Sequence, residues 1–330
     1  MELRNINENV LTTQVVEHNE NEQAKSKSSF IGGRTQRAHL DHLKNDCVIP
    51  VFSKDNETTI SHFQFIQKTK EVAQDLFPSY EINEPDIRVS HQIKGRVPSA
   101  IGKPVKELLP SEKTIYYERC AFMYELKSQR VEVDGNPLIL SLGGVRAYNQ
   151  ENLYSKKSLE KFKLFIGFQN KVCLNLCVSS DGFTNDVRVS SVNELESAVG
   201  ELFHQYNEEE HLESLEGFSQ LSITENQFAH LVGRARMYQH LSKTERNGIF
   251  PVLLNDGQIN QSVKDYYNSS DFKRANDGSI SLWNLYNLFT SAGKTSYIDS
   301  FLERNVNAYQ LVKHLGNSIK NDQYSWFLHN

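Results

Sequence analysis

A change of periodicity near residue 191 constrains the fold of this 330-residue chain more than any other feature. Between Thr114 and Ser191, short apolar segments alternate with turn residues, and Asp134-Gly135-Asn136-Pro137 predicts a β-hairpin between two of them. From Val192 onward, apolar residues recur at helical spacing. The sequence therefore predicts an α+β fold, in which an antiparallel sheet over about residues 114–191 is followed by a mainly helical C-terminal region.

The same patterns set the expected elements. Strands are expected at 115–126, 130–133, 138–142, 145–148, 162–168, 172–178 and 187–190, and a short extended segment at 48–53. Helices are expected at 61–76, 192–213, 222–241, 258–267, 282–291, 297–302 and 306–319. Ser222 to Glu225 has the form of a capping box at the start of one of these helices. Trp283 and its apolar neighbours are expected to pack in the core, with Asn287 as a buried amide that bridges backbone groups.

Three regions follow from composition and length. Residues 1–38 contain a long polar run and are expected to form a flexible tail. Residues 39–191 are expected to form the sheet domain with basic loops, and residues 192–330 a helical region packed on the sheet. Met1 to Asn21 has no apolar signal region, and no apolar run is long enough to span a membrane, so we expect a cytoplasmic protein.

Charge is unevenly distributed along the chain. Residues 88–173 hold 15 Lys and Arg against 8 Asp and Glu, whereas residues 181–220 hold 1 against 10. A basic block of this size is typical of a surface that binds a polyanion, although solvated lysines beside an acidic helix are the simpler interpretation. We expect the cations to form one contiguous surface away from the acidic 194–216 helix.

Two clusters within the basic block are the candidate nucleic-acid-binding residues. The first lies in a segment, 88–106, whose glycines and prolines predict a loop; the second combines cations with tyrosines, whose rings stack on bases or pack on the sheet. The candidates are Arg88, Lys94, Arg96, Lys103 and Lys106, followed by Arg146, Tyr148, Tyr154, Lys156, Lys157, Lys161 and Lys163. This combination favours single-stranded DNA or RNA as the partner.

The motifs of common enzyme and cofactor classes are missing. Gly293-Lys294-Thr295 resembles the end of a P-loop, but Leu288 stands where the first glycine is required and the preceding segment is helical. Nucleophile-elbow, dinucleotide-binding and zinc-protease motifs are absent from the sequence, and no cofactor is expected. Cys173 and Cys177 with His204 and His211 are too widely spaced for a typical zinc site, and His39 and His42 near Cys47 are weaker still. The four cysteines, which include Cys120, are expected to be free thiols.

One enzymatic alternative remains open at the sequence level. Asp86, Glu125 and Lys127 imitate the acid and acid-x-Lys arrangement of Mg²⁺-dependent nucleases, and Glu125 and Lys127 share one face of a strand. The separation of the two acids along the chain is long, so the sequence favours a protein without catalysis.

Several parts of the chain resemble known bacterial families. Ser281-Leu282-Trp283-Asn284-Leu285-Tyr286-Asn287-Leu288-Phe289-Thr290, with Tyr297-Ile298-Asp299, resembles the Trp-x-x-x-Asn-x-x-Thr helix of phage- and plasmid-associated proteins with a domain of unknown function. Phe165 to Phe168 and Asn170 to Asn175 resemble a strand and turn of the same set, and residues 48–330 resemble a narrower uncharacterised family of conjugative and integrated elements. The resemblance implies a mobile-element accessory protein and supplies no activity.

The sequence thus leaves three hypotheses. The first is a non-enzymatic accessory protein that binds single-stranded nucleic acid, and the second is an interaction module that regulates or counters a host or element-encoded protein through its acidic helix. The third is the Mg²⁺-dependent nuclease. Membrane partners are not expected.

Overall fold

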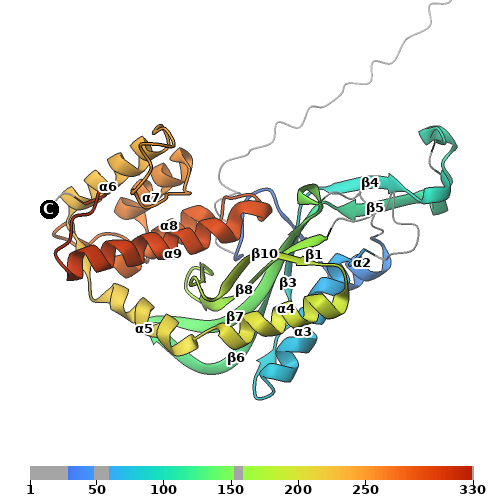
Figure 1. The fold of residues 1–330 in the computed structure, drawn as a ribbon, viewed down its shortest axis with the longest axis horizontal. Helices are drawn as coiled ribbons and strands as arrows, with labels where there is room; N and C mark the ends of the chain where they lie inside the picture. Colours follow the sequence, from blue (N-terminus) through green and yellow to red (C-terminus); the bar gives the residue numbers. More distant parts are fainter. Residues whose placement is uncertain (1–28, 48–58, 101, 152–158, 329–330) are drawn as a thin grey trace, which may run out of the picture.

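The computed structural model describes residues 29–47, 59–100, 102–151 and 159–328. Within them the chain is an α+β protein, as the sequence predicts: a large curled antiparallel sheet is covered by helices, and a long two-stranded arm projects from it (Figure 1). The expected segment at 48–53 lies outside the described residues.

The main sheet has the strand order β1-β3-β6-β7-β8-β10, with short β2 and β9 paired to β6 and β8. Its two longest strands, β6 and β7, form the hairpin expected at Asp134-Gly135, where both residues have positive φ angles of 50° and 74°. The strands are β1 (Gln36–Ala38), β2 (Glu81–Ile82), β3 (Asp86–Val89), β6 (Arg119–Val133), β7 (Asn136–Ala147), β8 (Glu160–Asn170), β9 (Leu176–Cys177) and β10 (Phe183–Val189). The sheet therefore begins before residue 114, because β1 and β3 extend its edge beyond the expected strands.

The sheet separates two hydrophobic cores. On β6, Phe122, Tyr124 and Leu126 face the larger core, which contains side chains of the helices α3 (His62–Leu76), α4 (Val192–Gln205), α5 (Glu208–Ser219) and α8 (Leu282–Gly293). The alternate residues Ala121 and Met123 face a smaller core with Phe301 and Leu302 of α9 and with Phe30 and Ile31. This alternation is what a strand buried on both faces requires. The sequence predicts a flexible tail that extends to residue 38. In the structure, Phe30 and Ile31 are buried and β1 is part of the sheet, so this prediction is wrong for residues 30–38.

Helices cover the sheet and make up most of the chain between Val192 and Lys320. They are α2 (Leu40–Asn45), α3 (His62–Leu76), α4 (Val192–Gln205), α5 (Glu208–Ser219), α6 (Glu225–Tyr238), α7 (Asp256–Asn268), α8 (Leu282–Gly293) and α9 (Ile298–Lys320), with a two-stranded ladder of β11 (Ser222–Ile223) and β12 (Ile280–Ser281). Three of them start with a complete capping box, in which Ser61, Thr224 or Asn255 exchanges hydrogen bonds with a glutamine three residues later.

The expected helix boundaries differ from the structure in three places. The 192–213 helix is interrupted at Asn207, which caps α5 and whose backbone N–H donates to Asp181 at 3.1 Å. The two helices expected at 297–302 and 306–319 are one helix, α9, in which buried Asn305 donates to the Leu176 carbonyl at 2.8 Å. The capping box expected at Ser222 starts at Thr224 instead, since Ser222 pairs in β11.

Trp283 and Asn287 lie where the sequence predicts. Trp283, Leu282 and Leu285 of α8 are fully buried in the larger core, and Phe289 is buried. Asn287 donates to the Trp283 carbonyl at 3.0 Å, and its own amide oxygen and carbonyl accept from Asn170 and Asn175 at 3.2 and 3.0 Å. This amide network fixes α8 to the turn after β8.

Candidate functional site

The basic arm consists of β4 (Gln92–Arg96) and β5 (Lys113–Tyr117) with the turns between them. It forms a separate two-stranded sheet, but its register matches that of β3 and β6: Val89 lies opposite Cys120, and Gln92 lies opposite Tyr117. The segment 88–106, expected to be a loop, is therefore largely strand and ordered turn. Gly95 serves this pairing, since a Cβ there would lie 2.7 Å from the Thr114 hydroxyl.

Cations gather on one face of the arm. Arg96 of β4 lies directly opposite Lys113 of β5. Lys94 precedes Arg96 by two residues in β4, so all three side chains share a face. Like charges in directly opposed positions destabilise a strand pair. Among the described residues, Lys94 and Lys113 have no ion-pair partner. The arrangement therefore favours an anionic ligand that supplies the missing countercharge.

The tip of the arm, residues 97–112, contains three short helical turns in its described parts, 97–100 and 102–112: η1 (Pro98–Ala100), η2 (Val105–Glu107) and η3 (Pro110–Glu112). Lys103 is paired with Glu112, and the Arg96 guanidinium donates to the Lys103 carbonyl at 2.5 Å. Lys106 is exposed and, in the described chain, has no ion pair. Two apolar side chains, Val105 and Leu109, are 69% and 58% exposed at this tip.

A second group of cations lies at the foot of the arm. Arg37 of β1 is directly opposite Arg88 of β3, which is paired with Asp86 at 2.9 Å. Arg119 lies on the same ribbon and is 3.4 Å from Asp299 of α9. Between the foot and the arm, Tyr117 is buried with its hydroxyl 3.1 Å from His42 of α2. The basic surface is therefore divided into two parts.

Arg146 is not at the surface. Its side chain is fully buried, and it makes a bidentate pair with Glu151 at 3.0 and 3.1 Å and a second pair with Glu160 at 2.5 Å. The guanidinium also donates to the Ile60 carbonyl and lies 4.6 and 4.5 Å from the ring centres of Tyr148 and Phe162. In this arrangement Arg146 holds β7, β8 and the start of α3 together and contacts no ligand.

The rest of the second sequence cluster is also largely internal. Tyr148 is buried, and Lys163 is buried against α9, where it donates to the Asp299 carbonyl and pairs with Glu303 at 2.6 Å. Lys161 is half-buried and 3.3 Å from Asp186. Tyr154, Lys156 and Lys157 lie outside the described residues. The expectation of one contiguous cationic surface is thus corrected for Arg146 and Lys163, because strand alternation turns both into the fold.

Burial shifts the pKa values around Arg146. Desolvation, with a smaller contribution from Arg146, lowers the pKa of His62 to about 3, and its Nε2 is 2.9 Å from the Tyr117 carbonyl. Desolvation also raises the pKa of Glu160 against the opposing attraction of Arg146. His62 Nδ1 and the Tyr148 hydroxyl have no hydrogen-bond partner among the described residues, and the two rings stack 4.5 Å apart. Among the described residues, Arg146 is the cation that pairs with both Glu151 and Glu160.

Acidification should destabilise the protein through two histidines. Burial lowers the pKa of His62 and of His211 to about 3, so the unfolded chain binds more protons below about pH 6.5. Their stabilising contribution is complete above that pH and is lost as pH falls toward 3. Between pH 7.5 and 5.0 we expect each to remove about 2 kcal/mol, partly offset by Glu160, whose raised pKa acts in the opposite direction. Urea unfolding at the two pH values measures this, and equal stability would contradict it.

The nuclease residues are only partly brought together. Asp86 lies opposite Met123 in the β3–β6 pair, so Asp86 and Glu125 are diagonal neighbours on one sheet face. However, Asp86 is paired with Arg88, Glu125 with Lys171 at 2.6 Å, and Lys127 with Glu81 at 2.7 Å. Each acid already has a cation, and no group of three His, Cys, Asp or Glu side chains in the described chain could hold a metal.

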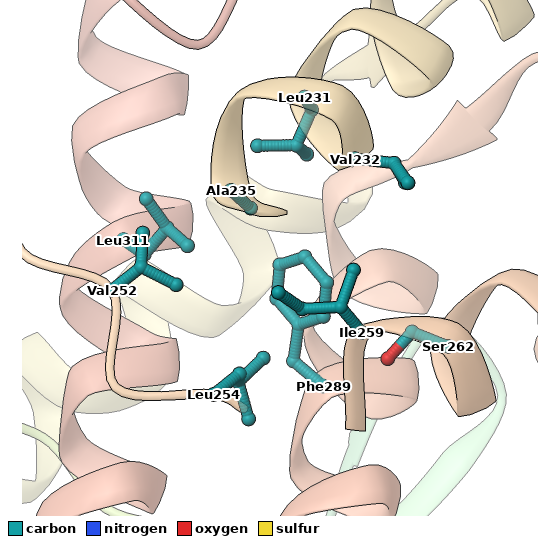
Figure 2. Close-up of a pocket in the computed structure, with 9 residues that line it drawn as sticks. All are labelled: Leu231, Val232, Ala235, Val252, Leu254, Ile259, Ser262, Phe289 and Leu311. Atoms are coloured by element: carbon teal, nitrogen blue, oxygen red, sulfur yellow. The ribbon is translucent and has the colours of Figure 1, made fainter. Parts of the chain in front are cut away.

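The other motif residues have structural surroundings. Cys120 and Cys177 are buried, Cys47 and Cys173 are half-buried, and all four are free thiols. Lys294 is buried at the end of α8 and donates to the Cys173 carbonyl, and burial lowers its pKa to about 8. Helix α8 precedes it, so no phosphate-binding loop forms. An apolar cavity of about 10 Å³ lies between α6, α7, α8 and α9 and is too small for a cofactor. Figure 2 shows Leu231, Ile259 and Phe289 converging on it.

A family model described as "Domain of unknown function, B. Theta Gene description (DUF3871)" matches residues 9–328. The chain belongs to the DUF3871 family. No curated protein and no solved structure matches this DUF3871 domain. Among the residues that the structure describes, it has no helix long and apolar enough to cross a membrane.

Charge in this DUF3871 domain is concentrated at two separate places. The arm, residues 90–117, holds five Lys and Arg against two Glu, and residues 192–219, which include α4 and α5, hold eight Glu and no Lys or Arg. Helix α5 lies on the other side of the molecule from the arm (Figure 1). The acidic residues of α5 are therefore well separated from the cations of the arm.

Sequence reasoning missed two cations of the DUF3871 domain, Lys113 and Arg37. Lys113 lies next to the first expected strand, but its partner Arg96 is separated from it by the 16 residues of the tip. Arg37 lies within residues 1–38, for which the sequence predicts a flexible tail. Only the pairing of distant segments reveals either residue.

Proposed function

We propose that the protein is a non-catalytic, nucleic-acid-binding accessory protein of a bacterial mobile element, that it acts in the cytoplasm, and that the arm is its binding surface. The observation that carries the proposal is the opposed pair Arg96 and Lys113 with Lys94 beside it, on a projecting two-stranded ribbon. A phosphate backbone supplies the regularly spaced negative charge that such a face lacks. The resemblance of the C-terminal segments to phage and plasmid proteins supports the mobile-element role.

The separation of α5 from the arm favours productive encounters. Negative charge on α5 repels a polyanion, whereas the arm attracts it, so the arm approaches first. This asymmetry also explains how a chain with a net charge of −5 can bind a polyanion.

Support for a preference for single strands is weaker than the sequence indicates. That preference rests on rings that stack on bases, and Tyr148 is buried while Tyr154 lies outside the described residues. On the arm itself, Tyr117 is buried and Tyr116 is half-buried. Contacts with phosphates are therefore the main source of affinity in our proposal.

Reversing three arm charges tests the assignment of the binding surface. The variant Lys94→Glu/Lys106→Glu/Lys113→Glu should fold normally, because these side chains are exposed and a glutamate opposite Arg96 removes a like-charge pair. We expect its affinity for a fluorescent 25-residue single strand or the matching duplex to fall at least about a hundredfold at low salt, since three phosphate contacts are lost.

A matched control separates local contacts from net charge. Lys243→Glu/Lys264→Glu/Lys273→Glu makes the same change in net charge at exposed positions of the helical region. Its affinity should fall less than about tenfold, because charges farther than a Debye length from the nucleic acid bound at the arm are screened. Equal losses in both variants would show that the arm is not the binding surface.

The interaction-module alternative remains a prediction. The negative surface of α4 and α5 suits a basic protein partner, but acidic helices are ordinarily solvated. If the natural protein binds neither single-stranded nor double-stranded nucleic acid at low salt, the interaction module becomes the leading hypothesis.

A further inference from the structure

The tip of the arm carries an unexplained feature. Val105 and Leu109 are among the most exposed large apolar side chains of the described chain, and they stand beside Lys103 and Lys106. An apolar pair at the end of a charged ribbon contributes nothing to the core. The exposure of these two side chains beside two lysines therefore favours a ligand that offers apolar surface next to negative charge.

The tip is ordered by its own hydrogen bonds. The Val97 amide donates to the Glu112 carbonyl at 3.0 Å, and the Leu109 amide donates to the Glu112 carboxylate at 2.9 Å. The same carboxylate pairs with Lys103, whose carbonyl accepts from Arg96. A pre-organised tip loses little conformational entropy on binding, so Val105 and Leu109 are held in place before the ligand arrives.

The dimensions of the arm match a DNA groove. Five residue pairs at about 3.4 Å per residue give a ribbon of roughly 17 Å, which exceeds the groove depth of about 8 Å. Its tip can therefore reach base pairs while the foot of the arm, at Gln92 and Tyr117, stays outside the groove.

We propose that the arm inserts into a groove of double-stranded DNA and that Val105 and Leu109 wedge against a base step and bend the duplex. This proposal rests on the proposed function, because it requires the cations of the arm to contact phosphates. Proteins that bend DNA use this combination of apolar wedges and flanking cations, and the bends reach roughly 20 to 90°. The arm provides both components in one ribbon.

A bending assay tests the wedge separately from the affinity. A duplex of about 25 base pairs with a donor and an acceptor dye at its two ends should show increased energy transfer when the natural protein binds, because wedging bends DNA. In Val105→Ser/Leu109→Ser, affinity should stay within about threefold, since phosphate contacts dominate, whereas the increase in energy transfer should disappear. The control Val172→Ser/Leu253→Ser removes two exposed apolar side chains elsewhere and should bend DNA normally.

The outcomes distinguish the two proposals. Binding of the duplex without increased energy transfer, or equal bending by the tip variant, would overturn the wedge and leave the proposed function standing. Absence of binding to any nucleic acid would overturn both. If the natural protein left the duplex straight but bound vesicles of anionic phospholipid, and the tip variant lost that binding, the partner would be a membrane surface and the wedge proposal would be wrong.

Discussion

Replacing Arg146 by methionine is expected to lower the free energy of unfolding by about 3 to 5 kcal/mol, because it leaves Glu151 and Glu160 buried without their cation. Urea unfolding measures the change. The matched control is Arg188→Met, which removes an ion pair with Asp186 from a side chain that is 60% exposed and should change stability by less than about 0.5 kcal/mol.

The pH dependence of the Arg146→Met variant identifies the cause. Burial already raises the pKa of Glu160, and without Arg146 the attraction that opposes this rise is gone. A carboxyl whose folded pKa is raised favours folding below its unfolded pKa and loses that contribution as pH rises. The stability gap between variant and natural protein should therefore narrow toward about pH 4.5. If the difference in unfolding free energy between the two proteins did not change with pH, lost packing rather than lost charge would be the main cause of the destabilisation.

Replacing Trp283 by alanine should cost about 3 to 5 kcal/mol, because a fully buried indole leaves a large cavity in the core. Trp326→Ala is the control, since Trp326 is only half-buried and packs against Arg234 at 4.8 Å; its effect should be clearly smaller. Thermal or urea unfolding measures both. A Trp283→Ala protein that unfolds like the natural one but no longer binds nucleic acid would show that α8 is a recognition surface.

The sequence predicted those parts of the fold that depend on local patterns. The β6–β7 hairpin follows from Asp134-Gly135, and the buried faces of α3, α4 and α8 follow from their helical spacing. The interruption at Asn207 was missed because helical spacing continues across it, and the continuity of α9 was missed because buried Asn305 is polar. In both cases a polar group at the boundary is satisfied by a distant residue, Asp181 for the Asn207 amide and the Leu176 carbonyl for Asn305, and the sequence does not reveal that partner.

The candidate site was harder to predict, because charge along the chain does not reveal which side chains face solvent. Arg146 and Lys163 lie in the basic block, yet they face Glu151, Glu160 and Glu303 inside the fold. Lys94 and Arg96 were assigned to a loop, whereas pairing with a strand 16 residues away places them on one face with Lys113. Long-range strand pairing is the information that a single sequence lacks.

The salt dependence of binding tests the arm as a nucleic-acid surface most directly. If the five cations of the arm each displace one counterion, log K for a duplex should fall against log salt with a slope of about −4.5, roughly a thousandfold loss between 50 and 250 mM. In Lys94→Glu/Lys106→Glu/Lys113→Glu the slope should shrink to about −2 or binding should vanish. A slope near zero in the natural protein, or the same slope in both proteins, would contradict the account.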